Sequence, residues 1–564
     1  MALPKKIWKI SRFHKGISNF NQEGHFWFSN GLEFDFYAPF LKVANKFFKE
    51  TDSDSLTTLS DVKWGTIFNN KNYIINQLDG KIFEYSSGWN EVHDNSNSWG
   101  GLGLFGDDDY LYYASNSYAG RYDKSTWIDS WQSFMISNSS DLCPIAKFLK
   151  FICFGNQRYL AVWDTANSTW NNNRLTLPPG YKIKWLAPLT DYLVISAHHD
   201  NFGSALFFWD GISQTYNRAL QLPHVQSLAG AVDKNTLYVI TKDGWISRFD
   251  GVGLIKLKRF PDMDLQDTIS ISPDAVKVYQ GLIYIAKTSN TYALDKRWQY
   301  CGIWVYNPTT NALYFKHRVS SHAVNNTTGG VINIGTLFLN YTGSTLRTVW
   351  YDGNKYVIDA SNDTGTLCPY KWGAYWISPL LDDEPYRRKR FIQMILNLCE
   401  PLPDTKFARY DIKYNNTEKD IKGLQYVSDG TSQTFTVGIM PGGWEVGDEV
   451  MIVSGPSAGQ VRHIASITGS GPYTITVDET LYYEEGVTGS YRSGDYVLVT
   501  PFKRIGTIRG DEDPGVINKM FRFNARSKKI KLKIEVWSNS GYTGQWDLGL
   551  VDISTVYVPD RIIK

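Results

Sequence analysis

Residues 160–170 read LAVWDTANSTW, and residues 206–216 read LFFWDGISQTY. Each phrase joins apolar residues to an aromatic residue, which is followed by an Asp that opens a turn. Five more stretches repeat this pattern: IFEYSSGW (82–89), GRYDKSTW (120–127), ISRFDGVGLIKL (246–257), IWVYNPTTNALYF (303–315) and TVWYDGNKYVI (348–358). The phrase therefore occurs seven times, and the chain is organised around it.

The aromatic residue at the centre of each phrase marks a period. These residues are Tyr85, Tyr122, Trp163, Trp209, Phe249, Tyr306 and Tyr351. The intervals between them are 37, 41, 46, 40, 57 and 45 residues. Periods near 40 residues are typical of repeat architectures such as β-propellers. The 57-residue interval before Tyr306 contains the insertion TSNTYALDKRWQYC, which could hide an irregular blade.

An alternating apolar run precedes each phrase, as in YIIN from Tyr73 and LVISA from Leu193. Two such runs joined by a polar turn predict an antiparallel hairpin. The residue after the aromatic supplies the turn, because an Asp or Asn side chain can bond the backbone two residues on. We expect this role for Asp123, Asp164, Asp210, Asp250, Asn307 and Asp352, with Ser86 as a weaker version.

These units predict an all-β protein with a seven-bladed β-propeller over residues 57–365. A long β-sandwich with evenly spaced strands is the alternative. Sandwich strands recur about every 8–12 residues without a blade-length period, which favours the propeller. An aromatic content of 15 % and abundant turn residues fit a chain of many short strands.

Residues 1–56 precede the repeat as an N-terminal arm that is basic at its start. Two alternatives stay open for it. The arm could pack along its own chain and lend a strand to the last blade, or it could reach an adjacent subunit. The other end of the chain, VDISTVYVPDRIIK (551–564), is apolar. Exposed apolar termini usually mark an interface, so we expect a closed homo-oligomer.

Residues 366–419 and 503–564 predict a β-sandwich whose strands pair across a long excursion. Within the second flank, KIKLKIEV (529–536) alternates with period two. This alternation predicts a half-exposed strand with apolar residues inward and basic residues outward.

The excursion, residues 420–502, has strand and turn signals of its own. GDEVMIV begins at Gly447 and GDYVLVT at Gly494, and Gly455-Pro456 and Gly471-Pro472 are turn signals between strands. These signals predict a small β-barrel domain inserted at a loop of the sandwich.

Composition excludes several classes of protein. The net charge of +2 provides no global field for nucleic acid, and we expect no specific nucleic-acid site. No run of about 18 apolar residues occurs, so we expect no membrane span. The opening MALPKKIWKISRF lacks the apolar core of a secretory signal. The five scattered cysteines are expected to be buried free thiols, which fits assembly in a reducing cytoplasm.

Candidate catalytic and metal-binding residues are few. His198, His199 and Asp200 are adjacent, but neighbours in an extended run point to opposite faces, so a solvated loop is favoured over a metal site. The run Asp107–Asp109 lacks the spacing of a Ca²⁺ loop and is interpreted as a hairpin tip. We expect no catalytic residue, no metal and no cofactor.

One further acidic group could be imagined as the paired carboxylates of a glycosidase. It comprises Asp382, Asp383 and Glu384. The basic run Arg387–Arg390 follows at once, which favours a charge-neutralising surface. No Ser-x-Asp-x-Gly-x-Thr-Trp box, Walker loop or nucleophile elbow occurs.

The opening KGISNFNQEGHFWFSNGLEFDFY (15–37) resembles the start of many tailed-phage virion proteins. The segment from Ile377 to Asp383, with Ser-Pro and an acidic turn before a terminal sandwich, resembles the end of such proteins. Tail nozzle proteins of short-tailed phages combine a propeller with extra β domains in a similar manner. The resemblance implies a structural virion component, assembled in the host cytoplasm as a homo-oligomeric ring or tip with other tail proteins, without catalysis. It carries over no functional residue.

Two other functions stay open beside this one. A receptor-binding tail protein would use exposed aromatic residues as platforms for host-surface glycans. Trp89, Trp127, Trp131 and Trp170 suit that role, although propellers also stack such residues between blades. A propeller-type glycosidase is the second alternative, and the lack of a catalytic constellation weakens it.

Overall fold

The structure is a computed structural model. It describes residues 5–559 except 19–23, 35–40, 45–46, 53–61, 87, 96–99, 138–141, 223–224, 262–268, 290–301, 319–332, 340–345, 352–355, 362–373, 383–385, 405–407, 418, 420, 441–442, 453–456, 458–459, 482–488 and 538–549. Within these residues the chain folds into strands, and the helical element is a single 3-10 turn, η1, at Pro273–Ala275. No helix of this described part is long and apolar enough to cross a membrane.

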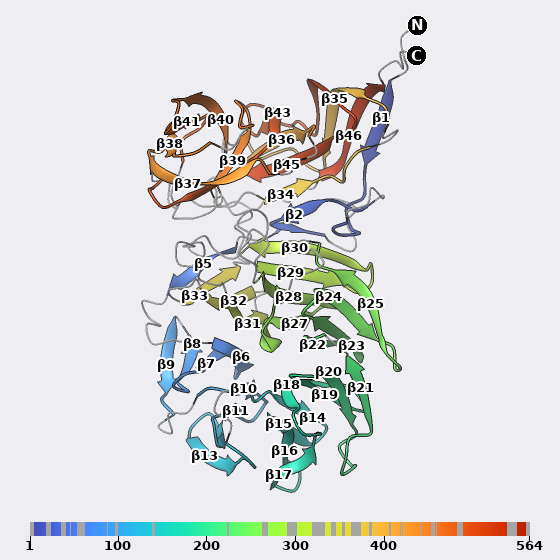
Figure 1. The fold of residues 1–564 in the computed structure, drawn as a ribbon, viewed down its shortest axis with the longest axis vertical. Coiled ribbons are helices and arrows are strands. Elements are labelled where there is room, and N and C mark those ends of the chain that lie inside the picture. Colours follow the sequence, from blue (N-terminus) through green and yellow to red (C-terminus); the bar gives the residue numbers. More distant parts are fainter. Residues whose placement is uncertain are drawn as a thin grey trace. The chain divides into compact units, whose positions relative to one another are not determined.

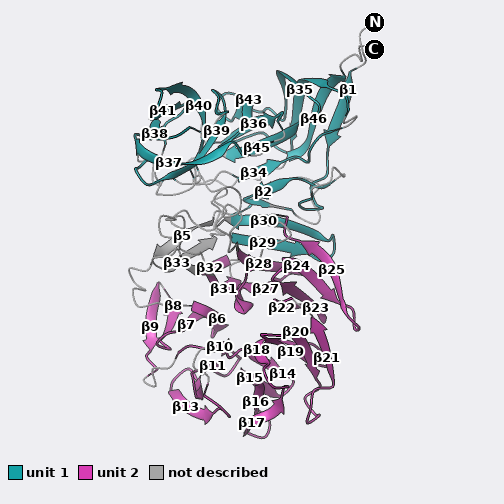
Figure 2. Cartoon of the chain, viewed as in Figure 1, with its two compact units in different colours: residues 1–48, 292–329, 361–564 teal, residues 49–291, 330–360 magenta. Residues whose placement is uncertain are grey.

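The chain divides into two compact units (Figure 2). One contains residues 1–48, 292–329 and 361–564, and the other contains residues 49–291 and 330–360.

Five four-stranded antiparallel sheets follow one another in chain order (Figure 1). They are β6–β9 (Val62–Phe68, Lys71–Asn76, Ile82–Tyr85, Trp89–His93), β10–β13 (Gly103–Gly106, Leu111–Ala114, Tyr118–Tyr122, Trp127–Ser133), β14–β17 (Ile145–Phe148, Phe151–Asn156, Tyr159–Asp164, Thr169–Thr176), β18–β21 (Lys182–Pro188, Leu193–His199, Gly203–Trp209, Arg218–Leu222) and β22–β25 (Ser227–Asp233, Thr236–Thr241, Trp245–Phe249, Leu254–Arg259). Each sheet is one predicted blade.

The sixth and seventh sheets depart from this simple order. The sixth runs β26-β28-β29-β30, and β27 also pairs with β28. The seventh runs β31-β32-β33-β5, so a strand from the N-terminal segment supplies its outer edge. Their bounds are β26 Ile269–Ser270, β27 Val276–Tyr279, β28 Leu282–Ser289, β29 Gly302–Asn307, β30 Ala312–Arg318, β31 Asn333–Leu339, β32 Leu346–Tyr351, β33 Tyr356–Ser361 and β5 Phe47–Asp52.

The innermost strands of the seven sheets form a closed ring. Each of β6, β10, β14, β18, β22, β27 and β31 contacts the next, and β31 contacts β6. Where the ring closes, a Cβ on Gly65 would lie 2.3 Å from the ring of Phe338, so β6 can approach β31 only with glycine there. The fold is therefore a seven-bladed β-propeller.

The β-sandwich consists of two sheets, ordered β1-β46-β35-β44 and β2-β34-β45-β36-β43. Their bounds are β1 Lys6–Ile10, β46 Leu550–Pro559, β35 Lys389–Leu398, β44 Asn518–Ser527, β2 Phe28–Asn30, β34 Ala374–Ile377, β45 Lys531–Trp537, β36 Arg409–Asn415 and β43 Lys503–Arg509. The sheets pack face to face, since a Cβ on Gly506 would lie 2.5 Å from the ring of Phe521 and the rings of Tyr414 and Phe523 are 5.3 Å apart.

The N-terminal segment pairs within its own chain. β1 lies antiparallel to β46, β2 to β34, and β5 extends the seventh blade. A short pair, β3 (Leu32–Glu33) and β4 (Lys42–Val43), connects them. Of the two alternatives for the arm, the structure has the strand lent to the last blade.

Two expectations of exposure are wrong. The terminal strand β46 is not exposed apolar surface, because Ile553 is fully buried and Tyr557 is 2 % exposed. The lysines of β45 do not face solvent either, because Lys531 and Lys533 are 4 % and 1 % exposed. Other parts of the fold cover the polar face of β45, which period-two alternation alone does not reveal.

The excursion forms a closed six-stranded barrel, ordered β37-β38-β41-β40-β39-β42. The strands are β37 Gly423–Gly430, β38 Thr434–Val437, β39 Glu449–Ile452, β40 Val461–Thr468, β41 Tyr473–Val477 and β42 Tyr496–Thr500. The barrel has its own apolar core, which includes Phe435, Trp444, Ile475 and Tyr491. Gly471-Pro472 lies in the turn between β40 and β41, and Gly455-Pro456 lies outside the described residues.

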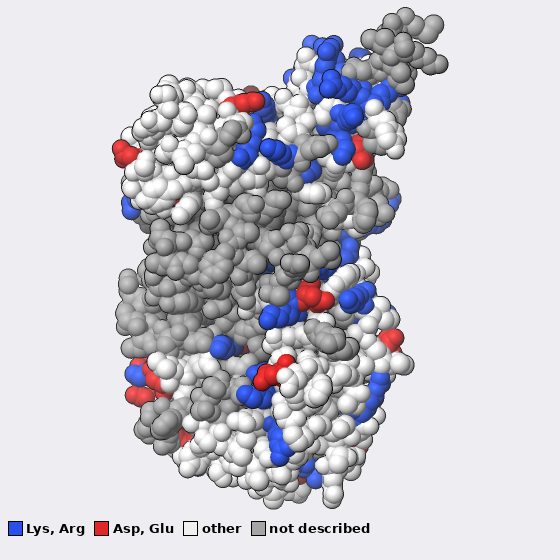
Figure 3. All heavy atoms as spheres, viewed as in Figure 1, with Lys and Arg blue, Asp and Glu red and all other residues white. Residues whose placement is uncertain are grey.

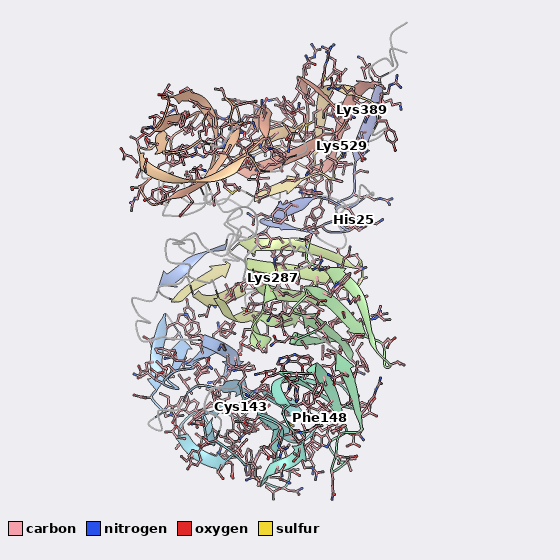
Figure 4. All side chains as sticks on the ribbon, viewed as in Figure 1. His25, Cys143, Phe148, Lys287, Lys389 and Lys529 are labelled. Atoms are coloured by element: carbon pink, nitrogen blue, oxygen red, sulfur yellow. The ribbon has the colours of Figure 1, made fainter. Side chains whose placement is uncertain are left out.

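The cysteines follow the expectation in part. Cys143 and Cys153 are free and buried, and burial raises the pKa of both thiols (Figure 4 labels Cys143). Cys399 is free but exposed. Cys301 and Cys368 lie outside the described residues.

Candidate functional site

Six of the seven repeated aromatic residues share one structural position. Tyr85, Tyr122, Trp163, Trp209, Phe249 and Tyr306 lie at or next to the end of the third strand of their blades. Tyr351 instead ends β32, the second strand of the seventh blade. Because β5 supplies the outer strand of that blade, the local sequence there provides only the first three strands, and the repeat is offset by one strand.

The shared position is a seam between blades. Tyr122 lies 6.1 Å from Phe68 of the preceding blade, between ring centroids. The corresponding distances are 4.7 Å from Trp163 to Trp131 and 4.9 Å from Phe249 to Phe208. The guanidinium of Arg347, from the seventh blade, lies 4.2 Å from the ring centroid of Tyr85. These four aromatic residues therefore join successive blades.

Trp209 is the most enclosed member of this set that the structure describes. Its side chain is fully buried, and its indole N–H donates to the carbonyl of Ser213 at 2.8 Å. Phe148 and Phe151 of the preceding blade pack against it at 6.4 and 5.9 Å, and Figure 4 labels Phe148. Trp163, by contrast, is half-buried.

The turn residues bond the backbone as the sequence predicts. Oδ1 of Asp210 accepts the N–H groups of Ile212 and Ser213, both at 2.8 Å. The same bonds, to the residues two and three positions on, occur at Asp123, Asp164, Asp250 and Asn307. Asp352 lies outside the described residues.

These bonds hold the turn carboxylates ionised. The hydrogen bond from the Lys150 ammonium, followed by bonds from Asn167, lowers the pKa of Asp164 to about 2. Backbone bonds from Ser213 and Ile212 lower the pKa of Asp210, and those from Gly253 and Val252 lower that of Asp250. Carboxylates with lowered pKa values accept hydrogen bonds well and are poor general acids.

A cavity of about 570 Å³ lies at the seam between the third and fourth blades. Its polar lining includes Asp164, Asn171 and Arg174, and its apolar lining includes Leu149 and Ile212, which are 59 % and 80 % exposed. The guanidinium of Arg174 donates to the carbonyl of Ile212 at 2.7 Å and lies over Trp209. Lys150, also in the lining, pairs with Asp164 at 2.7 Å. The cavity can therefore offer hydrogen bonds and an apolar rim.

The four tryptophans considered as glycan platforms pack within the propeller. Trp89 is 2 % exposed, and the other three are half-buried. Trp127 stacks between His93 and Tyr122, at 4.2 and 4.1 Å between ring centroids. Trp170 donates its indole N–H to the carbonyl of Ser133 at 3.0 Å. Trp89, which is buried, and Trp127, which is stacked on both sides, offer no open ring face of the kind that sugar stacking requires.

Several of the candidate metal ligands bond other groups or are exposed. No group of three His, Cys, Asp or Glu side chains with metal-binding geometry occurs among the described residues. Nδ1 of His199 accepts the N–H of Asn201 at 3.0 Å, and Asp200 is exposed. Asp107 pairs with Lys147 at 2.8 Å, whereas Asp108 and Asp109 are exposed at the hairpin tip.

The acidic group before the basic run is only partly described. Asp382 is half-buried, and Asp383 and Glu384 lie outside the described residues. In the basic run, Arg388 and Arg390 are exposed.

One buried, charged site of the described chain was not predicted from the sequence. It joins the inserted barrel to the sandwich and contains Lys413 of β36, Lys533 and Glu535 of β45 and Glu449 of β39, none more than 1 % exposed. Oε2 of Glu449 lies 2.7 Å from Nζ of Lys413, and its Oε1 lies 2.7 Å from Nζ of Lys533. Glu535 pairs with Lys413 on the sandwich side. We call these four residues the buried ion cluster.

The environment keeps Glu449 charged. Burial alone would raise the pKa of its carboxyl, but Lys413 and Lys533 outweigh that effect and hold the pKa below its ordinary range. Thr500 adds a hydrogen bond to Oε1 at 3.0 Å. Pairing and hydrogen bonding of this kind are what a buried charge requires.

A second group of ion pairs extends the same junction. Arg504 of β43 bridges Asp478 of the barrel at 2.9 Å and Asp411 of β36 at 3.2 Å. Arg409 reaches Glu479 of the barrel at 3.1 Å. The alternating charged residues of β36 (Arg409, Asp411, Lys413) and of β45 (Lys531, Lys533, Glu535) were the available signal. Their partners in the barrel lie far away in the sequence.

Comparisons with known proteins found solved structures of low similarity. No family model matches the chain, and no curated protein matches it. The solved WD40 domain of Neurospora crassa Pan2 is 10 % identical, with a TM-score of 0.37 over 56 % of this chain and 95 % of that one. The WD40 β-propeller domain of Doa1 is 11 % identical, with a TM-score of 0.38 over 56 % and 96 %. The computationally designed protein Ika8 is 11 % identical, with a TM-score of 0.35 over 53 % and 96 %.

Proposed function

We propose that this chain is a structural component of a bacteriophage tail that assembles as a homo-oligomeric ring or tip, in the manner of a nozzle or hub protein. The host cytoplasm is the place of assembly, and the other tail proteins are its partners. The resemblance of its opening segment and of its terminal sandwich to tailed-phage virion proteins supports this proposal.

The observation that carries the structural role is the buried ion cluster. A barrel on a flexible tether would need no charged partners in the sandwich. Here Glu449 of the barrel is enclosed between Lys413 and Lys533 of the sandwich, at 2.7 Å from each. Buried pairs contribute little net stability but favour a single geometry, because any displacement leaves a charge unpaired. Such a joint suits a subunit that must present its domains in a fixed arrangement.

The ionisable side chains that line the cavity also support a role without catalysis. Asp164 is the one carboxylate in the described lining of the cavity, and a glycosidase of the usual type needs two. Its pKa of about 2 is lowered, whereas a general acid needs a raised value. The aromatic repeat is used in the seams between blades.

The oligomeric state tests this proposal. We expect mass photometry of the full-length protein to show one closed oligomer, alone or with the neighbouring tail proteins. A deletion of the N-terminal arm cannot be used to test whether the arm mediates assembly, because removing residues 1–30 also removes β1 and β2 from the sandwich. Mass spectrometry of purified phage particles checks whether the protein is a component of the virion. A protein that stays monomeric with those partners and is missing from particles contradicts the proposal.

A second candidate function is binding of a host-surface glycan, and the cavity at the third and fourth blades favours it. Asn171 and Arg174 would bond sugar hydroxyls, and Leu149 would cover an apolar sugar face. The test is a glycan array probed with the natural protein and with Asn171→Trp, which fills the cavity. Binding that the variant loses supports this function, and no binding by the natural protein excludes it.

A further inference from the structure

One face of the sandwich is strongly basic. Strand register places Arg390 of β35 opposite Arg526 of β44, and Gln393 opposite Arg522. The same outward rows contain Ile7 and Lys9 of β1 and Met520 of β44, all exposed. We call these outward residues of β1, β46, β35 and β44 the basic face. Figure 3 shows Lys and Arg gathered where β35 and β1 lie in Figure 1.

The charge of these four strands is unbalanced. The exposed basic residues of these strands are Lys9, Arg390, Arg522 and Arg526. The one carboxylate of the four strands is Asp552. Asp552 is already occupied, since it lies 3.0 Å from Nζ of Lys9 and accepts a hydrogen bond from Asn397 at 2.6 Å. Arg522 and Arg526 form no ion pair with any carboxylate that the structure describes.

The pairing of Arg390 with Arg526 has an energetic cost. Like charges directly opposite each other on neighbouring strands destabilise a sheet. The hydrogen bond from Arg390 Nε to Asn524 Oδ1, at 2.9 Å, orients one guanidinium but does not neutralise it. An anionic partner that lies across the face would remove the repulsion and bind both guanidinium groups.

The apolar residues on the same face indicate the kind of partner. Ile7 is 69 % exposed and Met520 is 50 % exposed. Protein interfaces are enriched in Arg and Met and depleted of Asp and Glu, which fits the composition of this face. A nucleic acid backbone would use the arginines and leave the apolar groups uncovered.

A second copy in a two-fold contact does not fit. Such a contact brings the same patch of both subunits together, so arginines would face arginines. We infer that the basic face docks an acidic, partly apolar surface of a partner protein, which the same face of a second copy cannot provide. This inference does not depend on the phage proposal, because it concerns the chemistry of one face and not the location of the chain.

The test uses the full-length protein and a fluorescent 12-residue peptide of alternating Glu and Val. We expect binding that weakens with salt and that falls at least about tenfold in the triple variant Arg390→Glu, Arg522→Glu, Arg526→Glu. The matched control is Arg248→Glu, Lys256→Glu, Lys419→Glu, which changes the same charge at exposed positions elsewhere and should bind normally. If the triple variant fails to fold, Arg522→Gln alone should still weaken binding.

Two further arms identify the partner class. The double variant Ile7→Gln, Met520→Gln should weaken binding of the Glu-Val peptide but not of poly-glutamate. A 20-base-pair DNA duplex should bind more weakly than the peptide. The inference is overturned if the natural protein does not bind the peptide, if the control variant loses as much affinity as the triple variant, or if the duplex binds tighter through the same arginines.

Discussion

The carboxylate of Asp274 accepts the backbone N–H of Gly65 at 2.8 Å, although 209 residues separate them in the sequence. The same oxygen, Oδ2, accepts the hydroxyl of Thr336 at 2.5 Å. Asp274 belongs to η1, before the sixth blade's β27, whereas Thr336 lies in β31 of the seventh blade and Gly65 in β6 of the first. One buried side chain thus links three blades where the ring closes.

Replacing Asp274 by Ala should destabilise the propeller strongly. The change leaves the Gly65 N–H and the Thr336 hydroxyl without the carboxylate that accepts them in a buried site, which costs about 3–5 kcal/mol of unfolding free energy. Asp274→Asn keeps one acceptor oxygen and should cost less. Urea unfolding of both variants measures the difference. Equal losses would contradict the role assigned to the acceptor oxygen.

The two tryptophans of the repeat should differ in their contribution. Trp209→Ala removes a fully buried side chain and should cost about 3–5 kcal/mol. Trp163→Ala removes a half-buried one and should cost roughly half as much. Trp209→Phe, which keeps the ring contacts but loses the bond to Ser213, serves as the control. Thermal unfolding of the variants ranks them, and equal costs for Trp163 and Trp209 would show that burial does not decide the effect.

Removing the central anion of the buried ion cluster should be damaging. Glu449→Ala leaves Lys413 and Lys533 buried with Glu535 as their shared partner, and uncompensated buried charge costs about 3–5 kcal/mol. The quadruple change Glu449→Leu, Lys413→Met, Lys533→Met, Glu535→Leu removes all four charges together and should restore part of the loss. Unfolding of the three forms in urea provides the measurement. A harmless Glu449→Ala would show that water reaches this junction.

Deleting the whole barrel should lower the stability of the protein less than Glu449→Ala does. Removal of residues 423–500 with the flanks rejoined exposes Lys413 and Lys533 to water, where they need no partner. The barrel's apolar core is its own, so the propeller should keep its thermal transition. Calorimetry of the deletion variant tests this, and loss of the propeller transition would show a shared core.

The raised pKa of Asp495 should make the stability of the barrel fall as pH rises. Burial raises the pKa of its carboxyl to about 6, although the Arg492 N–H donates to it at 2.8 Å. Because the folded pKa exceeds the unfolded value near 3.9, this group's contribution is fully present below about pH 4 and is lost as pH rises through 6. Asp495→Asn should therefore stabilise the barrel by roughly 1–2 kcal/mol at pH 8 and by almost nothing at pH 4. Urea unfolding at the two pH values checks this, and an equal effect at both would contradict the raised pKa.

Local signals in the sequence were sufficient to predict the propeller repeat. The turn at Asp210 needs only an acceptor side chain and two N–H groups within three residues, and Trp209 precedes it in the same phrase. Because a blade consists mainly of such short-range hairpins, its period survives in the sequence. The inserted barrel was predictable for the same reason.

Only the tertiary structure decided which distant residues meet. The pairing of Lys6 with Tyr557, the strand that β5 lends to the seventh blade and the offset of Tyr351 all depend on long-range contacts. The clearest case is Lys533, which alternation places on a solvent-facing side and which the fold buries against Glu449. Alternation reports that the two faces of a strand differ, but only the packing of the whole chain determines whether the polar face meets water or a buried carboxylate.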